Sequence, residues 1–431
     1  MIKLLAALLP VLTRTSSAHA RRRAAAAARA GLFGAGALAV GWALAAASAA
    51  RAQNPPPAAA GSNAPAAFAI THGPFLQAPS PTGITISWAT SRKGVSRVEY
   101  RLESATQWQT NFPAHHGLID ADVTTHNVAL AGLEPGTAYR YRVVSREIVE
   151  FKPYQVTYGA TIASPEYGFT TFDPRKPAAA FVVLNDRHEK VEPLAASLAA
   201  VDWARVGLVF FNGDAVNSVE SESQLYRCLV DPIVPPFATR IPLVYVRGNH
   251  DTRGKFARQL LNYFPTDSGR YYYTLQEGPV MFLVLDGGED KADGSSEYSG
   301  LVDFDPYLHR EAEWLARQIQ DPAFQRAPFR IGLLHIPPAN DPDPKFIRRK
   351  WLQDHLVPIL NRGQLDLLIC GHMHKYSLHP AGHEGRDFPL IIGGTETVIR
   401  GDVTREQIRL TTTDLSGREL PQLPPIQRRS R

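Results

Sequence analysis

Two different patterns of apolar and polar residues divide the chain. Between about residues 70 and 172, apolar residues alternate with polar ones over short runs, as at Ile84, Ile86 and Trp88. Glycine, proline and asparagine residues separate these runs. Short runs of period two between turn residues are typical of an antiparallel β-sandwich. We therefore predict a β-sandwich domain over residues 68–173.

After Pro174 the pattern changes to continuous apolar runs, which cover residues 179–184, 207–211, 242–246, 280–285, 330–334 and 365–370. Such runs are typical of strands that are buried on both faces. Helix-like stretches, such as 190–203 and 309–320, lie between several of them. Buried strands that alternate with helices predict an α/β domain, which we place at residues 178–412. We expect the tail from 413 to 431 to be disordered.

The N-terminal segment has the features of an export signal. The cluster Arg21–Arg23 precedes an apolar run from 31 to 50, and Ala50-Arg51-Ala52 forms an A-x-A cleavage site. We expect export by either the Sec or the twin-arginine route. Cleavage after residue 52 would then leave a periplasmic or secreted protein. An uncleaved anchor is less favoured, because the run is rich in Ala and Gly rather than Leu. Residues 53–67 then form a Pro- and Ala-rich linker.

The positive charge of the chain is concentrated in this segment. The whole sequence has a formal net charge of +5, but residues 1–52 contain seven basic residues and no acidic one. The remainder therefore carries a formal charge of −2, and we expect no nucleic acid partner. No later segment is long and apolar enough to cross a membrane, so we expect no span after signal cleavage. The two cysteines are too few for a disulfide framework or a cysteine zinc cluster.

Residue types that bind metal ions follow five of the predicted strands. They occur in Asp186-Arg187-His188, Gly213-Asp214, Gly248-Asn249-His250-Asp251, Leu334-His335 and Gly371-His372-Met373-His374. Sites form at the carboxyl ends of strands in α/β sheets, so the five segments can converge. In extended chain, residues i and i+2 point to the same side, so D-x-H and H-x-H can each present two side chains to one ion. A single His or Asp is more often structural, but the ordered set predicts a metal site.

The order of these motifs resembles that of the calcineurin-like metallophosphoesterases over residues 178–412. The segments 73–77 (GPFLQ) and 133–141 (LEPGTAYRY) resemble the fibronectin type III-like domain that precedes the catalytic domain in purple acid phosphatases. There, a tyrosine hydroxyl ties the start of a strand to the preceding corner. The resemblance implies an N-terminal antiparallel β-sandwich, followed by an α/β metallophosphoesterase domain. That domain would have a β-sandwich core flanked by helices and a binuclear metal site.

The resemblance also implies a role for each motif residue. Asp186, His188 and His374 would bind the first metal, Asn249, His335 and His372 the second, and Asp214 would bridge both. Oxygen and nitrogen ligands of this kind suit two divalent ions such as Fe, Mn or Zn. A metal-bridging hydroxide would attack a small phosphate-ester substrate, with His250 as proton donor. Asp251 would orient His250, with a plain turn or cap residue as the alternative.

The motifs depart from those of true purple acid phosphatases at two positions. Asn217 stands where those enzymes have the tyrosine that ligates ferric iron and gives their colour, and His188 stands where they have a glycine. An imidazole therefore replaces the phenolate. We predict a colourless site that has no requirement for ferric iron.

Three functions remain open from the sequence. The first is a binuclear metal-dependent phosphomonoesterase, similar to acid phosphatases. The second is a phosphodiesterase on the same site, because the sequence does not show the shape of the pocket. The third is a non-catalytic extracytoplasmic binding protein, against which the intact ligand set argues.

Overall fold

The computed structural model describes residues 66–429. The predicted export signal, residues 1–52, lies outside the described residues, as do all but the last two residues of the predicted linker. Among residues 66–429, no helix has both the length and the apolar character needed to span a membrane.

One long strand organises the β-rich N-terminal part of the described chain. This strand, β2 (Gly83–Leu102), pairs antiparallel with two strands through its first half and with two others through its second half. The first two are β1 (Ile70–Ser80) and β6 (Val123–Ala131), and the others are β3 (Gln109–Asn111) and β7 (Ala138–Lys152). A register shift between Ala89 and Gly94 separates the halves, so β2 contributes to both layers of the predicted sandwich. The remaining strands of this part are β4 (Ala114–His115), β5 (Leu118–Ile119), β8 (Gln155–Ala163) and β9 (Tyr167–Thr170).

Apolar side chains fill the space between these layers. Ile84, Ile86 and Trp88, which alternate in the sequence, are buried in one cluster with Tyr139. The backbone N–H of Glu134 donates a hydrogen bond to the Tyr139 hydroxyl at 2.9 Å. This bond ties the strand to the preceding corner, as the sequence resemblance implied.

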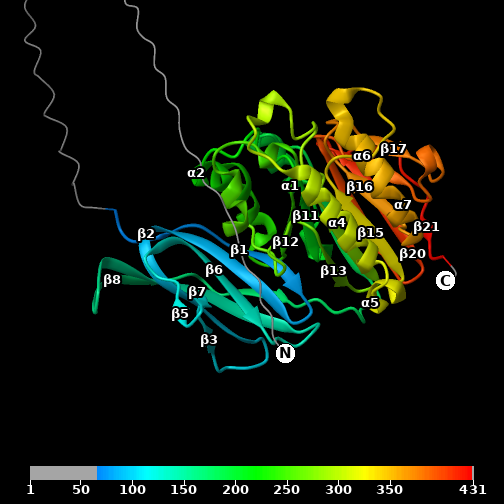
Figure 1. Ribbon diagram of the computed structural model, residues 1–431. Helices are drawn as coiled ribbons and strands as arrows, with labels where there is room; N and C mark the ends of the chain where they lie inside the picture. Colours follow the sequence, from blue (N-terminus) through cyan, green and yellow to red (C-terminus); the bar gives the residue numbers. More distant parts are fainter. Residues whose placement is uncertain (1–65, 430–431) are drawn as a thin grey trace, which may run out of the picture. The chain divides into compact units, whose positions relative to one another are not determined.

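The α/β part contains two mixed sheets that pack face to face, with helices on both outer sides (Figure 1). The first sheet has the order β20-β19-β10-β11-β12, and the second has the order β13-β14-β15-β16-β18-β17. The first consists of β10 (Ala179–Leu184), β11 (Leu208–Asn212), β12 (Leu243–Val246), β19 (Thr397–Val403) and β20 (Gln407–Asp414). The second consists of β13 (Tyr273–Glu277), β14 (Val280–Leu285), β15 (Phe329–Leu334), β16 (Leu367–Cys370), β17 (Ser377–His379) and β18 (Leu390–Ile392). Each predicted apolar run forms one of these strands, and the expected α/β fold is confirmed.

Amphipathic helices cover the outer faces. In α4 (Phe304–Gln318), Leu308 and Leu315 lie on the buried face of the helix, and Leu315 packs in a cluster with apolar residues of the second sheet. The other α-helices are α1 (Val191–Ala199), α2 (Glu222–Leu225), α3 (Asp231–Ile233), α5 (Pro322–Arg326), α6 (Ile347–His355) and α7 (Val357–Arg362). Two π-helical segments, Tyr226–Val230 and Val234–Ala238, lie on either side of α3. Short 3-10 turns occur at Trp203–Arg205, His250–Thr252, Ala257–Asn262, Ser296–Tyr298, Pro344–Phe346 and His383–Gly385.

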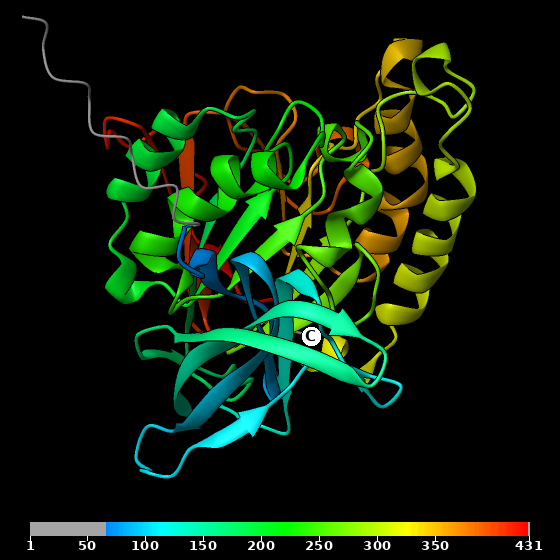
Figure 2. The same cartoon turned by 90° about the vertical axis from the view of Figure 1, so that its left-hand side faces the viewer.

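The β-rich part lies against the α/β part (Figure 2), and backbone pairing and polar side-chain contacts join it to the first sheet. β1 pairs parallel with β12 at Gln77 and Leu243, so hydrogen bonding continues from one part into the other. The Gln77 amide donates to the Ser87 hydroxyl at 2.6 Å and to the Tyr263 carbonyl at 2.8 Å. Ser87 alternates with apolar residues in β2, yet it is buried, because this face of the strand packs against the α/β part rather than water.

The C-terminal segment differs from the prediction. We expected disorder from residue 413, but residues 413–429 are folded onto the first sheet. β21 (Ile426–Gln427) pairs antiparallel with β20, and the Tyr376 hydroxyl donates to the Pro421 carbonyl at 2.6 Å. Leu423 and Ile426 pack against the cluster between the two sheets. Two apolar anchors in a proline-rich segment are enough to dock it, and composition alone did not reveal them.

Candidate metal centre

All seven residues predicted as metal ligands lie just beyond the carboxyl ends of five strands. Asp186 and Asp214 follow β10 and β11 by two residues, and Asn249 follows β12 by three. In the second sheet, His335 comes directly after β15, and the His372 motif begins after β16. Neighbouring strands among these five are parallel within each sheet, so their carboxyl ends meet at one edge.

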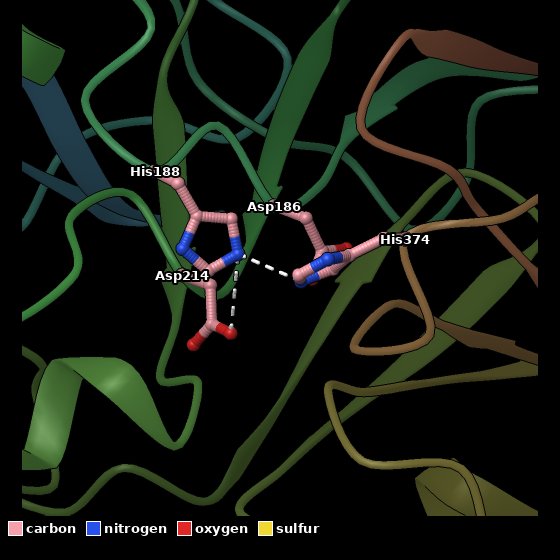
Figure 3. A group of neighbouring side chains, drawn as sticks. All are labelled: Asp186, His188, Asp214 and His374. Carbon is pink, nitrogen blue, oxygen red and sulfur yellow. Dashed lines mark hydrogen bonds and ion pairs between the residues drawn. The ribbon is translucent and has the colours of Figure 1, made fainter.

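One group of side chains could hold a metal ion with four ligand atoms. It consists of Asp186, His188, Asp214 and His374, whose ligand atoms all lie within 4.8 Å of one another. His188 faces both Asp214 and His374, as Figure 3 shows. Its Nε2 atom lies 2.8 Å from Nε2 of His374 and 3.8 Å from Oδ2 of Asp214. His374 Nε2 is 3.6 Å from Oδ1 of Asp186, so the four side chains surround one small volume.

A second group consists of Asp214, His335 and His372. Asn249 lies beside it, because its Oδ1 atom is 2.9 Å from Nδ1 of His372. Asp214 is the one residue that belongs to both groups. The structure thus brings the seven predicted residues together, and Asp214 is common to the two groups.

Glycines let these segments approach closely. A Cβ atom at Gly248 would lie 2.2 Å from Oδ1 of Asp214, and a Cβ atom at Gly371 would lie 2.6 Å from Oδ2 of Asp186. Each glycine therefore makes room for a carboxylate that another strand contributes. This packing explains why a glycine precedes the ligand in these two motifs.

The hydrogen bonds of His335 favour a cation in the second group. Its Nδ1–H donates to the Asn212 carbonyl at 2.7 Å, which leaves the lone pair on Nε2. That Nε2 is buried and lies 3.0 Å from Oδ2 of Asp214 and 3.8 Å from Oδ1 of Asp186. A lone pair and a carboxylate oxygen, both buried and facing each other, fit a metal ion between them.

The pKa values of three of the four imidazoles favour metal binding at neutral pH. Burial lowers the pKa of His188 to about 4 and that of His372 to about 3, and burial also lowers the pKa of His374. These rings are therefore neutral at pH 7 and have a lone pair to donate. Burial opposes the charge on His335, but the Asp214 and Asp186 carboxylates outweigh it and raise the pKa of His335 to about 10. In the absence of a cation, a proton on His335 balances the carboxylates.

Burial has the opposite effect on the pKa of the Asp186 carboxyl, because it again favours the neutral form. Burial raises the pKa of its carboxyl to about 7, with a smaller contribution from the nearby Asp214. The pKa of Asp214 is lowered, because the charge of His335 outweighs the effect of burial. Only the ionised carboxylate binds a metal ion, so metal binding at Asp186 competes with a proton near neutral pH.

The two predicted catalytic residues have different surroundings. Nδ1–H of His250 donates to the Asn217 carbonyl at 2.8 Å, and Nη1 of Arg253 lies 3.2 Å from its Nε2. The expectation that Asp251 orients His250 is wrong. Asp251 Oδ2 instead accepts the backbone N–H groups of Asp214 and Gly248, at 2.9 and 2.8 Å. It joins two ligand loops, because its side chain points into the protein rather than toward the imidazole.

Sequence reasoning missed Asp290. Its Oδ2 accepts the amide of Asn249 at 3.3 Å and an N–H of Arg253 at 3.2 Å. Its other oxygen, Oδ1, lies 3.4 Å from Nε2 of His372 and has no hydrogen-bond partner among the described residues. Asp290 thus touches two predicted ligands. It lies in an irregular loop after β14, outside every recognisable motif, so the sequence carried no signal for it.

Comparisons with known proteins agree with this geometry. Residues 179–376 match the calcineurin-like phosphoesterase family, and residues 74–171 match the purple acid phosphatase N-terminal domain. The chain contains a calcineurin-like phosphoesterase domain. This family consists of metal-dependent phosphoesterases in which a dinuclear centre is typical, and the two groups of Asp and His residues that share Asp214 could hold such a centre.

Two solved structures of this phosphoesterase fold are similar to the chain. The purple acid phosphatase PPD1 from seeds of yellow lupin (Lupinus luteus) is 14% identical, with a TM-score of 0.60, and the match covers 80% of this chain and 72% of that one. The structure of PhoD is 12% identical, with a TM-score of 0.54, and the match covers 81% of this chain and 92% of that one. At these identities, the likeness shows the shared fold.

Proposed function

We propose that this phosphoesterase is a binuclear metal-dependent phosphomonoesterase that acts outside the cytoplasm. One observation carries the proposal. The carboxylate of Asp214 belongs to both groups of side chains that could hold a metal ion, so it could bridge two ions. A shared carboxylate offsets the repulsion between two divalent ions held about 3.5–4 Å apart. The predicted export signal supports a location in the periplasm or outside the cell.

The residues that would hold the metals are those of the two groups. Asp186, His188 and His374 would bind one ion, and Asn249, His335 and His372 the other, with Asp214 shared. Two bound divalent metals would supply Lewis-acid contacts to phosphate oxygens and lower the pKa of a bound water, so that it can attack phosphorus near neutral pH. Fe, Mn and Zn all suit this mixture of nitrogen and oxygen ligands.

In this proposal, His250 would move the proton. The hydrogen bond from Nδ1–H to the Asn217 carbonyl fixes the ring, so Nε2 is the atom available to exchange a proton with the leaving oxygen. The His250 and His188 rings meet edge to face, with centroids 4.8 Å apart, which places His250 at the border of the first group. Arg253, beside Nε2, is itself held by Glu289 at 2.6 Å.

The test is hydrolysis of p-nitrophenyl phosphate and bis-p-nitrophenyl phosphate by the purified protein. Each assay is run with chelator and then with added Mn²⁺, Zn²⁺ or Fe²⁺. We expect metal-dependent turnover, with kcat/KM for the monoester well above that for the diester. A preference for the diester would replace the proposal with a phosphodiesterase on the same site.

Asp214→Asn is the matched control, because it keeps the shape of the side chain and removes the shared negative charge. If neither ester is hydrolysed with any metal and the protein does not retain metal, the proposal fails and a binding protein is the better interpretation.

Detection of the intact N-terminus on protein recovered from the periplasm or the medium would contradict cleavage of the signal.

A further inference from the structure

A cavity lined by arginines lies beside the metal centre, and neither the motifs nor the proposed chemistry use it. Its volume is about 480 Å³, within the range of small-molecule sites. The lining includes four arginines and three aromatic rings, and Asp303 is the one acidic residue among the lining residues. The arginines are Arg247, Arg258, Arg270 and Arg310.

Three of these arginines have no acidic partner. Arg258, Arg270 and Arg310 are exposed and make no ion pair with any residue in the range 66–429. Arg258 donates one hydrogen bond, to the Leu301 carbonyl at 3.0 Å. The cavity therefore has an excess of positive charge, although the chain after residue 52 carries a formal charge of −2. Such a local excess attracts an anionic ligand.

The fourth arginine, Arg247, is held rigidly in the lining of the cavity. Arg247 makes an ion pair with the buried Asp286 at 2.5 Å, and its guanidinium lies 3.9 Å from the centre of the Tyr271 ring. The Phe304 and Tyr307 rings lie 5.6 Å from the same group. Its Nε atom is buried and has no hydrogen-bond partner among the described residues. Aromatic contacts on the guanidinium hold it in place.

Strand register places Arg247 at the same level of the sheets as the predicted metal ligands. Val246 of β12 pairs with Asn212 of β11, so the next residue, Arg247, lies at the level of the segment that ends in Asp214. Leu285 of β14 pairs with Leu334 of β15, so Asp286 lies beside His335 in the same way. Thr252, which also lines the cavity, donates to the Asn249 carbonyl at 2.8 Å. Arg247 and Thr252 thus connect the cavity to the strand ends that carry the predicted metal ligands.

We propose that this cavity binds a second phosphate group of the substrate while the metal centre acts on the first, so that the preferred substrates are small esters with two phosphate groups. The inference rests on the proposed phosphoesterase function and specifies its substrate class. Arginine forks match phosphate oxygens in a bidentate manner, which explains why arginine rather than lysine lines the cavity.

The experiment compares fructose 1,6-bisphosphate with fructose 6-phosphate, which share a sugar and differ in one phosphate. Phosphate release is measured for the wild type, Arg258→Ala, Arg310→Ala and the double variant. The control is Arg317→Ala, an exposed arginine of α4 that does not line the cavity. We expect the wild type to have at least a 10-fold higher kcat/KM for the bisphosphate. In each cavity variant, kcat/KM for the bisphosphate should fall about 10-fold, and kcat/KM for fructose 6-phosphate should stay within 2-fold of the wild type. In the control variant, kcat/KM for both sugars should stay within 2-fold of the wild type.

Equal loss for both sugars, or no loss for either, would overturn the inference. A binding measurement separates this outcome from a failure of the proposed function. Calorimetric titration of fructose 1,6-bisphosphate into chelator-treated protein tests the cavity without turnover. If no ester is hydrolysed but Arg258→Ala and Arg310→Ala each weaken binding about 10-fold relative to Arg317→Ala, the cavity is supported and the phosphomonoesterase proposal is not. If Arg258→Ala, Arg310→Ala and Arg317→Ala bind the bisphosphate with equal affinity, the cavity is not the second phosphate site.

Discussion

Backbone strain is concentrated at the candidate metal ligands. Asp186, His188, Asp214, His372 and His374 all have φ values between 47° and 70°, in the left-handed region. A residue other than glycine in this region costs on the order of 1–3 kcal/mol, and it persists only where its surroundings hold it. Here the carboxylate of Asp186 accepts the backbone N–H of His372 at 2.9 Å. The fold thus fixes the ligand directions before any metal binds.

The substitution Asp214→Asn should remove both metals rather than one. The carboxylate is shared, and an amide provides neither its charge nor two equivalent oxygens. We expect metal content, measured by mass spectrometry after dialysis, to fall from two ions per chain to less than one, and activity to fall about 10³-fold. Asn249→Ala, which changes only the second group, should retain one ion. Two ions per chain in Asp214→Asn would contradict the bridging role.

Asp290→Asn should weaken the second metal site selectively. Asp290 orients the Asn249 amide and contacts His372, and loss of such an outer contact lowers metal affinity by about 10- to 100-fold. The measurement is competitive titration against a chromophoric chelator, which resolves the two affinities. Asp293→Asn, in the same loop, is the control, since Asp293 pairs with Arg348 instead of a ligand. If Asp293→Asn has the same effect, Asp290 acts only through loop stability.

The absence of a tyrosine ligand at residue 217 should be visible in the absorption spectrum. The Asn217 side chain donates to Glu189 at 3.1 Å rather than facing the two ligand groups. We expect protein loaded with ferric iron to lack a tyrosinate charge-transfer band in the visible region. The control is an equimolar sample loaded with Zn²⁺. An intense visible band in the iron sample would contradict this prediction.

At the scale of single elements, β6 contains a pH-sensitive histidine far from the metal motifs. His126 is buried, its Nε2 lies 3.0 Å from the Thr90 hydroxyl, and burial lowers its pKa to about 4. The unfolded chain therefore binds a proton between about pH 6.5 and 4 that the folded chain does not. The stability contributed by neutral His126 is present above pH 6.5 and is lost as the pH falls toward 4, by roughly 3 kcal/mol.

Urea unfolding followed by circular dichroism at pH 7 and pH 4.5 tests this contribution. His126→Gln should reduce the loss of stability between the two pH values by about 2 kcal/mol, because it removes the titrating ring. His116→Gln is the control, since His116 is exposed. An unchanged pH dependence in His126→Gln would show that other groups dominate acid unfolding.

The individual strands and loops show which features the sequence could predict. The ends of β10, β11, β12, β15 and β16 were predictable, because an apolar run that stops at a ligand residue is a local signal. Asp290 and the docked segment around Leu423 were not, since their roles depend on contacts with residues far away in the chain. The role of Asp251 was wrong for a related reason. Its position next to His250 does not determine which way its side chain points.

For the whole molecule, the metal centre lies where two separate sheets meet. Asp186, Asp214 and Asn249 follow strands of the first sheet, and His335 and His372 follow strands of the second. Metal ions held by both sets would therefore connect the sheets as well as supply chemistry. Ions that bind the folded but not the unfolded chain stabilise it by mass action.

Metal removal should therefore lower the thermal stability of the molecule, and more at high pH than at low pH. At 1,000 times Kd, a bound ion contributes about 4 kcal/mol, which corresponds to a rise in Tm of roughly 10 °C for a domain of this size. Burial raises the pKa of Asp186 to about 7, so a proton competes with the metal at this carboxylate below pH 7 and not above it. Calorimetric scans with chelator or Zn²⁺ should give a larger shift at pH 8 than at pH 5.5. Asp214→Asn should abolish the shift at both pH values, and an equal shift in that variant would place the stabilising ion elsewhere.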